Sequence, residues 1–132
     1  MTEVSNLTPW GYHAIVDCAQ CDSSAINSES SIRAWLTELV PVVGTSGVGE
    51  AHIAITGVGD TNKEGLTVFQ LLDAGSITAR FVNSSSHLYT DVFSCKEFTL
   101  QTVEDITKKY FGNDITINKI LLPRNAAVRP PN

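Results

Sequence analysis

The sequence lacks any long hydrophobic run, is poor in basic residues and has few cysteines. No apolar stretch approaches the roughly 20 residues that a membrane-spanning helix needs, which argues against a membrane protein. Residues 1–10 lack the basic and apolar regions of a signal peptide, so we expect a cytoplasmic location. Lys and Arg number 9 against 14 Asp and Glu, which gives a net charge of -5 and leaves no basic stripe for a nucleic acid. A cationic ligand suits this charge better.

Three cysteines, an odd number without a predicted signal peptide, indicate free thiols rather than a disulfide framework. Cys18 and Cys21 form a Cys-x-x-Cys pair, but a tetrahedral zinc site needs a second pair of ligands at similar spacing, and the sequence has none. The pair follows a predicted strand instead of opening a helix, which argues against thioredoxin-like redox chemistry. We therefore expect no metal site.

A chain of 132 residues, 42% of them hydrophobic, is long enough for one compact domain and too short for two ordinary ones. We assign residues 1–123 to this single domain. Residues 124–132 contain Pro130-Pro131 and few apolar side chains, so we expect a loose tail, or one that rests on a partner subunit.

Hydrophobic periodicity predicts two helices. Ile32, Trp35, Leu36, Leu39 and Val40 recur at helical spacing, and this stripe stops at Pro41. A second stripe runs over residues 100–110, with Thr99 placed to cap its start and Gly112 to close it. Alternating or β-branched runs predict strands at residues 12–17, 52–56, 66–72, 77–83, 87–94 and 115–122.

The order strand, helix, four strands, helix, strand predicts an α+β fold. Short links between consecutive strands favour a mostly antiparallel sheet, and each helix has a single apolar stripe to bury, so both helices should cover the same face. The result is a two-layer α/β sandwich. Its other sheet face needs a cover, from which we expect a homodimer or a higher homo-oligomer.

Two segments carry the strongest chemical signal. The first is residues 65–80, Gly-Leu-Thr-Val-Phe-Gln-Leu-Leu-Asp-Ala-Gly-Ser-Ile-Thr-Ala-Arg. The second is residues 91–95, which resemble the Asp-(Ile/Val)-Phe-(Ser/Thr)-Cys strand of prokaryotic, pyruvoyl-type S-adenosylmethionine decarboxylases. Residues 11–13, 17 and 21–22 are similar to that family's first strand and the turn after it. In element order the resemblance covers residues 10–122, and it extends to the shortened copies carried by marine bacteriophages, for which the location would be the host cytoplasm.

The resemblance implies a carboxy-lyase of spermidine (polyamine) biosynthesis that acts on S-adenosylmethionine. In that family a serine cleaves the peptide bond before it and becomes a pyruvoyl group, which forms a Schiff base with the substrate and accepts the electrons released with carbon dioxide. The family's spacing from Cys95 places this serine at Gly75, its preceding glutamate at Ala74 and a processing histidine at Arg80. Glycine has no hydroxyl and arginine stays protonated, so neither residue suits self-processing.

Three nearby residues keep groups that such chemistry uses. By resemblance, Thr67 has a hydroxyl in place of a processing serine, and Cys95 has the thiol of the family's proton donor. Ser76 directly follows Gly75, and Gly-Ser bonds are cleavage sites in other pyruvoyl enzymes. A one-residue shift turns a side chain to the opposite face of a sheet, so cleavage before Ser76 needs a bulge there. We expect no cofactor unless Gly75-Ser76 cleaves itself, in which case it is pyruvoyl.

The candidate ligand-binding residues are His13, Asp17, Glu64 and Asp91, since carboxylates and aromatic faces can hold a sulfonium cation. Each catalytic or binding assignment has an ordinary alternative. Cys95 can be a small buried apolar group, His13 a hydrogen-bonded core histidine, and Asp17 and Asp91 residues that close strands. Three phenylalanines are expected in the core, at positions 69, 81 and 93.

Three functions stay open. The first is a diverged family member that binds S-adenosylmethionine or a related compound without the usual pyruvoyl serine. The second is a lyase that breaks S-adenosylmethionine at its sulfonium with a general base and no carbonyl cofactor. The third is a non-catalytic regulatory subunit of an active decarboxylase.

Overall fold

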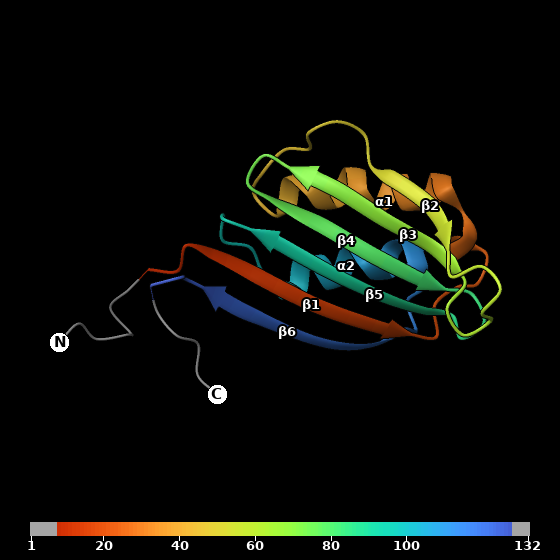
Figure 1. The fold of residues 1–132 in the computed structure, drawn as a ribbon. Helices are drawn as coiled ribbons and strands as arrows, with labels where there is room; N and C mark the ends of the chain where they lie inside the picture. The colour runs from red at the N-terminus through yellow and green to blue at the C-terminus, as the bar shows by residue number, and fades with distance from the viewer. Residues whose placement is uncertain (1–7, 128–132) are drawn as a thin grey trace.

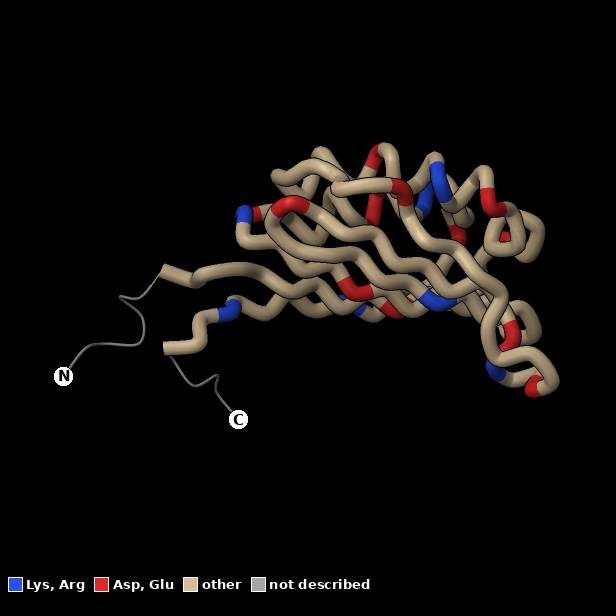
Figure 2. The backbone as a smooth tube through the Cα atoms, turned by 45° about the horizontal axis from the view of Figure 1, so that its top comes forward, with Lys and Arg blue, Asp and Glu red and all other residues tan. Residues whose placement is uncertain are grey.

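The computed structural model describes residues 8–127, which form one six-stranded sheet with two α-helices on one face (Figure 1). Seen as a tube, the backbone separates into the same two layers, helices and sheet (Figure 2). This confirms the predicted two-layer α+β sandwich. No helix of the described chain is long and apolar enough to cross a membrane. The elements are β1 (Gly11–Ala19), the short 3₁₀ helix η2 (Ala25–Asn27), α1 (Glu29–Val42), β2 (His52–Thr56), β3 (Gly65–Leu72), β4 (Gly75–Val82), β5 (His87–Ser94), α2 (Leu100–Phe111) and β6 (Thr116–Arg124).

The strand order in the sheet is β2-β3-β4-β5-β1-β6, and each neighbouring pair is antiparallel. The strands β2 to β5 follow one another through short connections, as the sequence predicted. The first strand, β1, lies between β5 and β6, so the two ends of the described chain meet at the same edge. Trp10 N–H donates to the carbonyl of Arg124 at 2.7 Å there.

The core fills the space between the helices and the sheet. Trp35 of α1 is fully buried, and its Nε1 donates to Thr107 Oγ1 of α2 at 3.2 Å. The ring of Trp35 meets Phe81 and Phe111 edge-on, with ring centroids 6.1 and 5.4 Å away. These aromatic contacts fix α1, α2 and β4 against one another.

Helix α1 is longer than its apolar stripe predicted. It begins at Glu29 because Ser28 accepts a hydrogen bond from the Ser31 N–H, which caps the helix. The expectation that it stops at Pro41 was wrong by one residue, since Pro41 lies inside the helix and Val42 ends it. Proline is tolerated in this last turn because the hydrogen bond it removes would involve only Thr37, which is exposed. In α2, by contrast, the predicted Thr99 cap and Gly112 closure are both observed.

Two strand boundaries differ from the prediction in places that matter for function. Strand β4 begins at Gly75 instead of residue 77, so Gly75 and Ser76 pair within the sheet. Strand β6 continues to Arg124, because it pairs with β1 as far as Gly11. Arg124, predicted to begin a loose tail, is therefore part of the sheet, and residues 128–132 of the predicted tail lie outside the described part of the chain.

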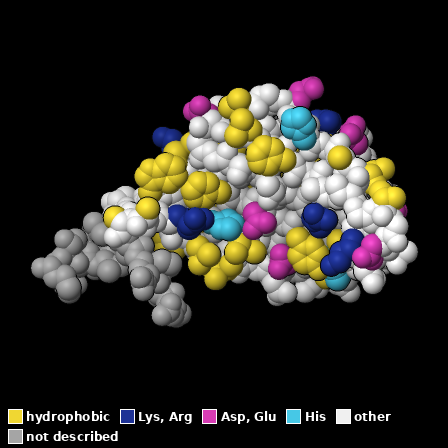
Figure 3. All heavy atoms as spheres, viewed as in Figure 1, with side chains coloured by type: hydrophobic (Ala, Val, Ile, Leu, Met, Phe, Trp, Pro, Cys, Tyr) yellow, Lys and Arg dark blue, Asp and Glu magenta, His cyan; other side chains and the backbone are white. Residues whose placement is uncertain are grey.

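The sheet face away from the helices is uncovered, and we call it the open face. Alternate residues of each strand point to it, and apolar side chains form patches on this face (Figure 3). Five large side chains on it are exposed. They are Phe69, Leu71, Tyr89, Ile120 and Leu122. Phe81 is in the core as expected, but the core assignment was wrong for Phe69 and Phe93, because their register places them on the open face.

Candidate functional site

The turn between β3 and β4 lies beside the end of β5. Cys95 N–H donates to the carbonyl of Ala74 at 2.8 Å, and Gly75 is paired with Ser94. The connector after α1 holds the same turn from another side, since Asp73 N–H donates to Ser46 at 2.9 Å. The structure therefore brings Gly75, Ser76 and Cys95 together and fixes the backbone around them.

Gly75 is required by this backbone. A Cβ atom added there would lie 1.8 Å from the carbonyl oxygen of Phe93 and 2.7 Å from its carbonyl carbon. Real Cβ atoms do not approach backbone that closely, so any side chain at this position forces β4 and β5 apart. The position at which the sequence resemblance predicts the family's serine thus has neither a hydroxyl nor room for one, and it does not fit a pyruvoyl group.

Ser76 faces away from the helices, between Leu71 of β3 and Phe93 of β5. The pairing of β4 with β5 runs without interruption from Gly75 to Val82, so there is no bulge at Ser76. Gly75 and Ser76 consequently lie on opposite faces of the sheet. Ser76 therefore does not occupy the place of Gly75 in the sheet, and its side chain is on the open face.

Thr67 and Arg80 form a second group on the open face. They are directly opposite each other in β3 and β4, and Thr67 Oγ1 lies 2.5 Å from Thr56 Oγ1 of β2. Arg80 is four residues beyond Ser76 along one strand, which corresponds to about 13 Å. Within one chain, therefore, neither Thr67 nor Arg80 reaches the turn at Gly75.

His13 and Asp91 form a hydrogen-bonded pair on the open face. His13 Nε2 lies 3.1 Å from Asp91 Oδ1, and the side chains are 22% and 53% exposed. His13 is not a core histidine, and Asp91 does not close a strand, because it lies within β5. Residue 13 pairs with Phe93, so this dyad adjoins the aromatic side chain next to Ser76.

The other two acidic candidates are farther from the turn. Asp17 also lies within β1 and pairs with Tyr89, one step beyond the dyad. Glu64 lies just before β3, and its carbonyl accepts from Asn83 N–H at 3.1 Å. The whole of β3 therefore separates Glu64 from Gly75, and Glu64 lies at the open end of the hairpin that Gly75 helps to close.

An aromatic and cationic cluster completes this end of the open face. Trp10 stacks on Phe93 with ring centroids 5.9 Å apart, and the Arg124 guanidinium carbon lies 5.3 Å from the centroid of the Phe93 ring. Trp10 is 63% exposed, so one of its ring faces is available to a ligand. Sequence reasoning did not assign Trp10 or Arg124, because each acquires its place only when β6 pairs with β1.

The three cysteines differ in their environments. Cys18 and Cys21 are buried, and burial raises the pKa of Cys18 to about 12 and that of Cys21 to about 11. Cys95 is partly exposed, so the alternative of a fully buried apolar group was wrong for it. Among the described residues no cluster of three or more metal-ligating side chains occurs.

These environments predict selective thiol chemistry. At pH 8 a thiol reagent such as 5,5′-dithiobis(2-nitrobenzoic acid) should label Cys95 rapidly and leave Cys18 and Cys21 unlabelled until the protein unfolds, because buried neutral thiols are poor nucleophiles. The unfolded chain loses the two thiol protons near pH 9.0 while the folded chain retains them to about pH 11, so stability should fall as the pH rises through this window. Rapid labelling of all three native thiols would contradict the structure.

Comparisons with known proteins identify one family and one similar fold. A family model described as S-adenosylmethionine decarboxylase matches residues 12–121. A crystal structure of the adenosylmethionine decarboxylase from Aquifex aeolicus is similar to this chain with a TM-score of 0.74 and 19% sequence identity, over 96% of this chain and 99% of that one. No curated protein sequence matches significantly. At this level of identity the structural likeness supports the fold alone.

Proposed function

Because the chain belongs to the S-adenosylmethionine decarboxylase family, we propose that it binds S-adenosylmethionine or a related sulfonium compound on the open face and forms no pyruvoyl group at Gly75. The observation that carries this proposal is the fit of Gly75 itself. Gly75 lies in strand β4, and any larger residue there would place its Cβ atom 1.8 Å from the Phe93 carbonyl oxygen. In this proposal residue 75 therefore allows β4 to pair with β5 and forms no cofactor.

The residues around the turn suit a sulfonium ligand. The exposed face of Trp10 offers a surface for a cation or a flat ring, a contact worth about 0.5–2 kcal/mol. Asp91 supplies a carboxylate beside Phe93, and His13 holds that carboxylate in place at 3.1 Å. Arg124 lies on the other side of Phe93 and can pair with the carboxylate of an amino-acid ligand.

The first test is mass and binding on the freshly purified chain. Denaturing mass spectrometry should give one uncut species, and isothermal titration calorimetry should detect S-adenosylmethionine. Asp91→Asn should weaken this binding about tenfold, because it removes a charged partner of the ligand. Asp114→Asn, which removes the same charge from an exposed loop elsewhere, should not change it. Two fragments that meet between Gly75 and Ser76 would overturn the uncut assignment, and equal effects of the two variants would overturn the site.

The His13–Asp91 dyad favours a second candidate, a lyase that needs no carbonyl cofactor. A neutral His13, oriented by Asp91, would remove a proton from the carbon next to the one bonded to sulfur. That C–H electron pair would form a double bond while the C–S pair leaves on sulfur as methylthioadenosine. Release of methylthioadenosine that is lost in His13→Gln would support this activity, whereas binding without breakdown would leave only the first candidate.

We further propose that the open face is covered by a second copy of the chain. The exposed apolar residues lie across the breadth of the sheet, from β3 to β6, and a two-fold dimer would bury all of them on both copies. The same contact would enclose the ligand site, which is otherwise open to water.

Dimer formation should depend on this apolar patch, which extends to the edge strand β6. Ile120→Lys places a charge among apolar neighbours and should raise the dimer dissociation constant at least about 100-fold. Val58→Lys changes an exposed residue of the β2–β3 loop and should leave it unchanged. Sedimentation velocity over a concentration series measures both. A wild-type monomer that pairs only with an active decarboxylase would instead support the regulatory subunit.

A further inference from the structure

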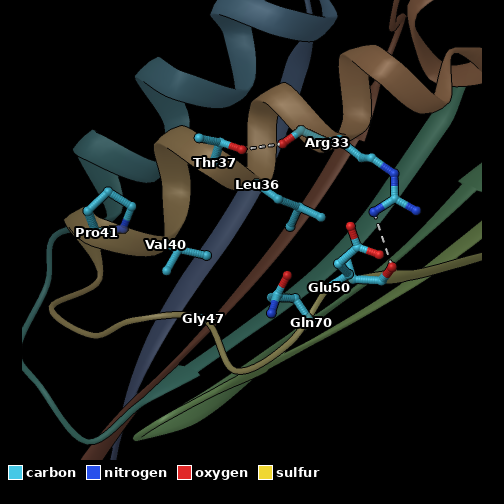
Figure 4. Close-up of a pocket in the computed structure, with 9 residues that line it drawn as sticks. Arg33, Leu36, Thr37, Val40, Pro41, Gly47, Glu50 and Gln70 are labelled. Carbon is cyan, nitrogen blue, oxygen red and sulfur yellow. Dashed lines mark hydrogen bonds between the residues drawn. The ribbon is translucent and has the colours of Figure 1, made fainter.

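A groove on the helix side of the sheet lies away from the open face. It has a volume of about 360 Å³ and runs between α1 and the connector that leads to β2 (Figure 4). That volume is within the range of small-molecule sites. One wall is apolar and consists of Leu36, Val40 and Pro41, while Gln70 of β3 forms the floor.

Gln70 is a polar side chain at a core-facing position. It is only 6% exposed, and its strand neighbours on the same face, Val68 and Leu72, are apolar and buried. Its Nε2 donates to the carbonyls of Gly49 at 3.3 Å and Leu71 at 2.8 Å. Because both partners are acceptors, they fix which end of the carboxamide is nitrogen.

The Gln70 oxygen consequently points into the groove toward Leu36 (Figure 4). It accepts no hydrogen bond from any described residue. The oxygen faces an open groove beside an apolar wall, where a donor of a ligand can replace water as its hydrogen-bond partner. The side chain therefore marks the floor of the groove as a place for a hydrogen-bond donor.

The charges at the rim indicate which donor fits. The Arg33 guanidinium is directed away from the floor of the groove, since Nη1 donates to the Ala51 carbonyl at 3.2 Å and Nη2 lies 3.8 Å from Glu29 Oε1. Glu50 is exposed at the rim and forms no ion pair with any described residue. Among the side chains that the structure describes along this groove, Glu50 and the Gln70 oxygen are acceptors without a bonded donor.

We propose that this groove binds a small organic cation, a protonated primary amine on a short aliphatic chain. The ammonium group, which has three donors and no acceptor, would bond the Gln70 oxygen and Glu50. Its methylene groups would lie along Leu36, Val40 and Pro41. The site is independent of the proposed ligand on the open face, because the sheet separates the two.

The experiment is a titration of ¹⁵N-labelled full-length protein with n-butylammonium chloride and, separately, with sodium butyrate, followed by heteronuclear NMR. The ammonium should shift the Gln70 side-chain signals and the amides of residues 47–51, with saturation in the millimolar range expected of so small a ligand. Butyrate should not shift them. Amides of the open face should stay unchanged with both.

Two variants test the assigned partners. Glu50→Gln and Gln70→Met should each weaken ammonium binding about tenfold, while Asp114→Asn should not. If Gln70→Met fails to fold, Glu50→Gln and the comparison with butyrate still decide. Stronger binding of butyrate would show that Arg33 selects an anion, and equal binding of both compounds would show unselective apolar contact. No shift with either compound would show that the groove binds neither. Each of these three results would overturn the proposal.

Discussion

Gly75→Ser should lower the free energy of unfolding by about 3 kcal/mol and should still give an uncut chain. The loss of stability follows from geometry, because the added Cβ would lie 1.8 Å from the Phe93 carbonyl oxygen and β4 and β5 must separate to admit it. The absence of cleavage follows from the neighbours. The turn remains tied to Ser46 and Cys95, and Arg80 stays protonated and so cannot accept a proton as a base.

Urea denaturation and mass spectrometry on the same sample measure both effects. Ala74→Ser is the matched control, since it adds a hydroxyl one residue earlier on a carbon that already exists, and it should change stability by less than about 0.5 kcal/mol. A Gly75→Ser protein that is as stable as the parent would show that the backbone has room for the family's serine. Cleavage of the Gly75→Ser protein would show that glycine at position 75 is by itself enough to prevent self-cleavage.

Trp35→Ala should be the most destabilising single substitution, at about 4 kcal/mol. The side chain is fully buried and contacts Phe81 and Phe111, so its removal leaves a cavity where α1, α2 and β4 meet. Loss of the bond to Thr107 adds little, because that hydroxyl also donates to the Val103 carbonyl at 2.7 Å and stays satisfied.

Trp10→Ala is the comparison that separates burial from residue type. Trp10 is 63% exposed, so its removal should change global stability by less than about 0.5 kcal/mol while it weakens binding of a ligand on the open face. Urea midpoints of the two variants should therefore differ widely. Similar midpoints would mean that Trp35 is not at the centre of the core.

Much of the fold could be predicted because its signals are local. The stripe from Ile32 to Val40 repeats at the helical period, and the runs in residues 66–72 and 87–94 have the length and composition of strands, whatever they pack against. One stripe per helix sufficed to place both helices on one face. The family followed from a short segment, Asp91 to Cys95, and the matched family model confirms it.

The site was harder to predict, because the sequence does not show which of the candidate residues lie close together in the folded chain. His13 and Asp91 are 78 positions apart, and they meet because β1 inserts between β5 and β6. Glu64 seemed equivalent to Asp91 by composition, yet antiparallel pairing places it at the far end of β3 from Gly75. Phe93 looked like a core residue until its register placed it on the open face.

The sequence by itself determined the elements and the two-layer class, since each depends on the identity or the short-range period of residues. Only the tertiary structure decided which face is open, which polar residues share it, and why Gly75 is glycine. That last reason is a contact with the carbonyl of Phe93, 18 residues later, and such a contact exists only after the strands have paired.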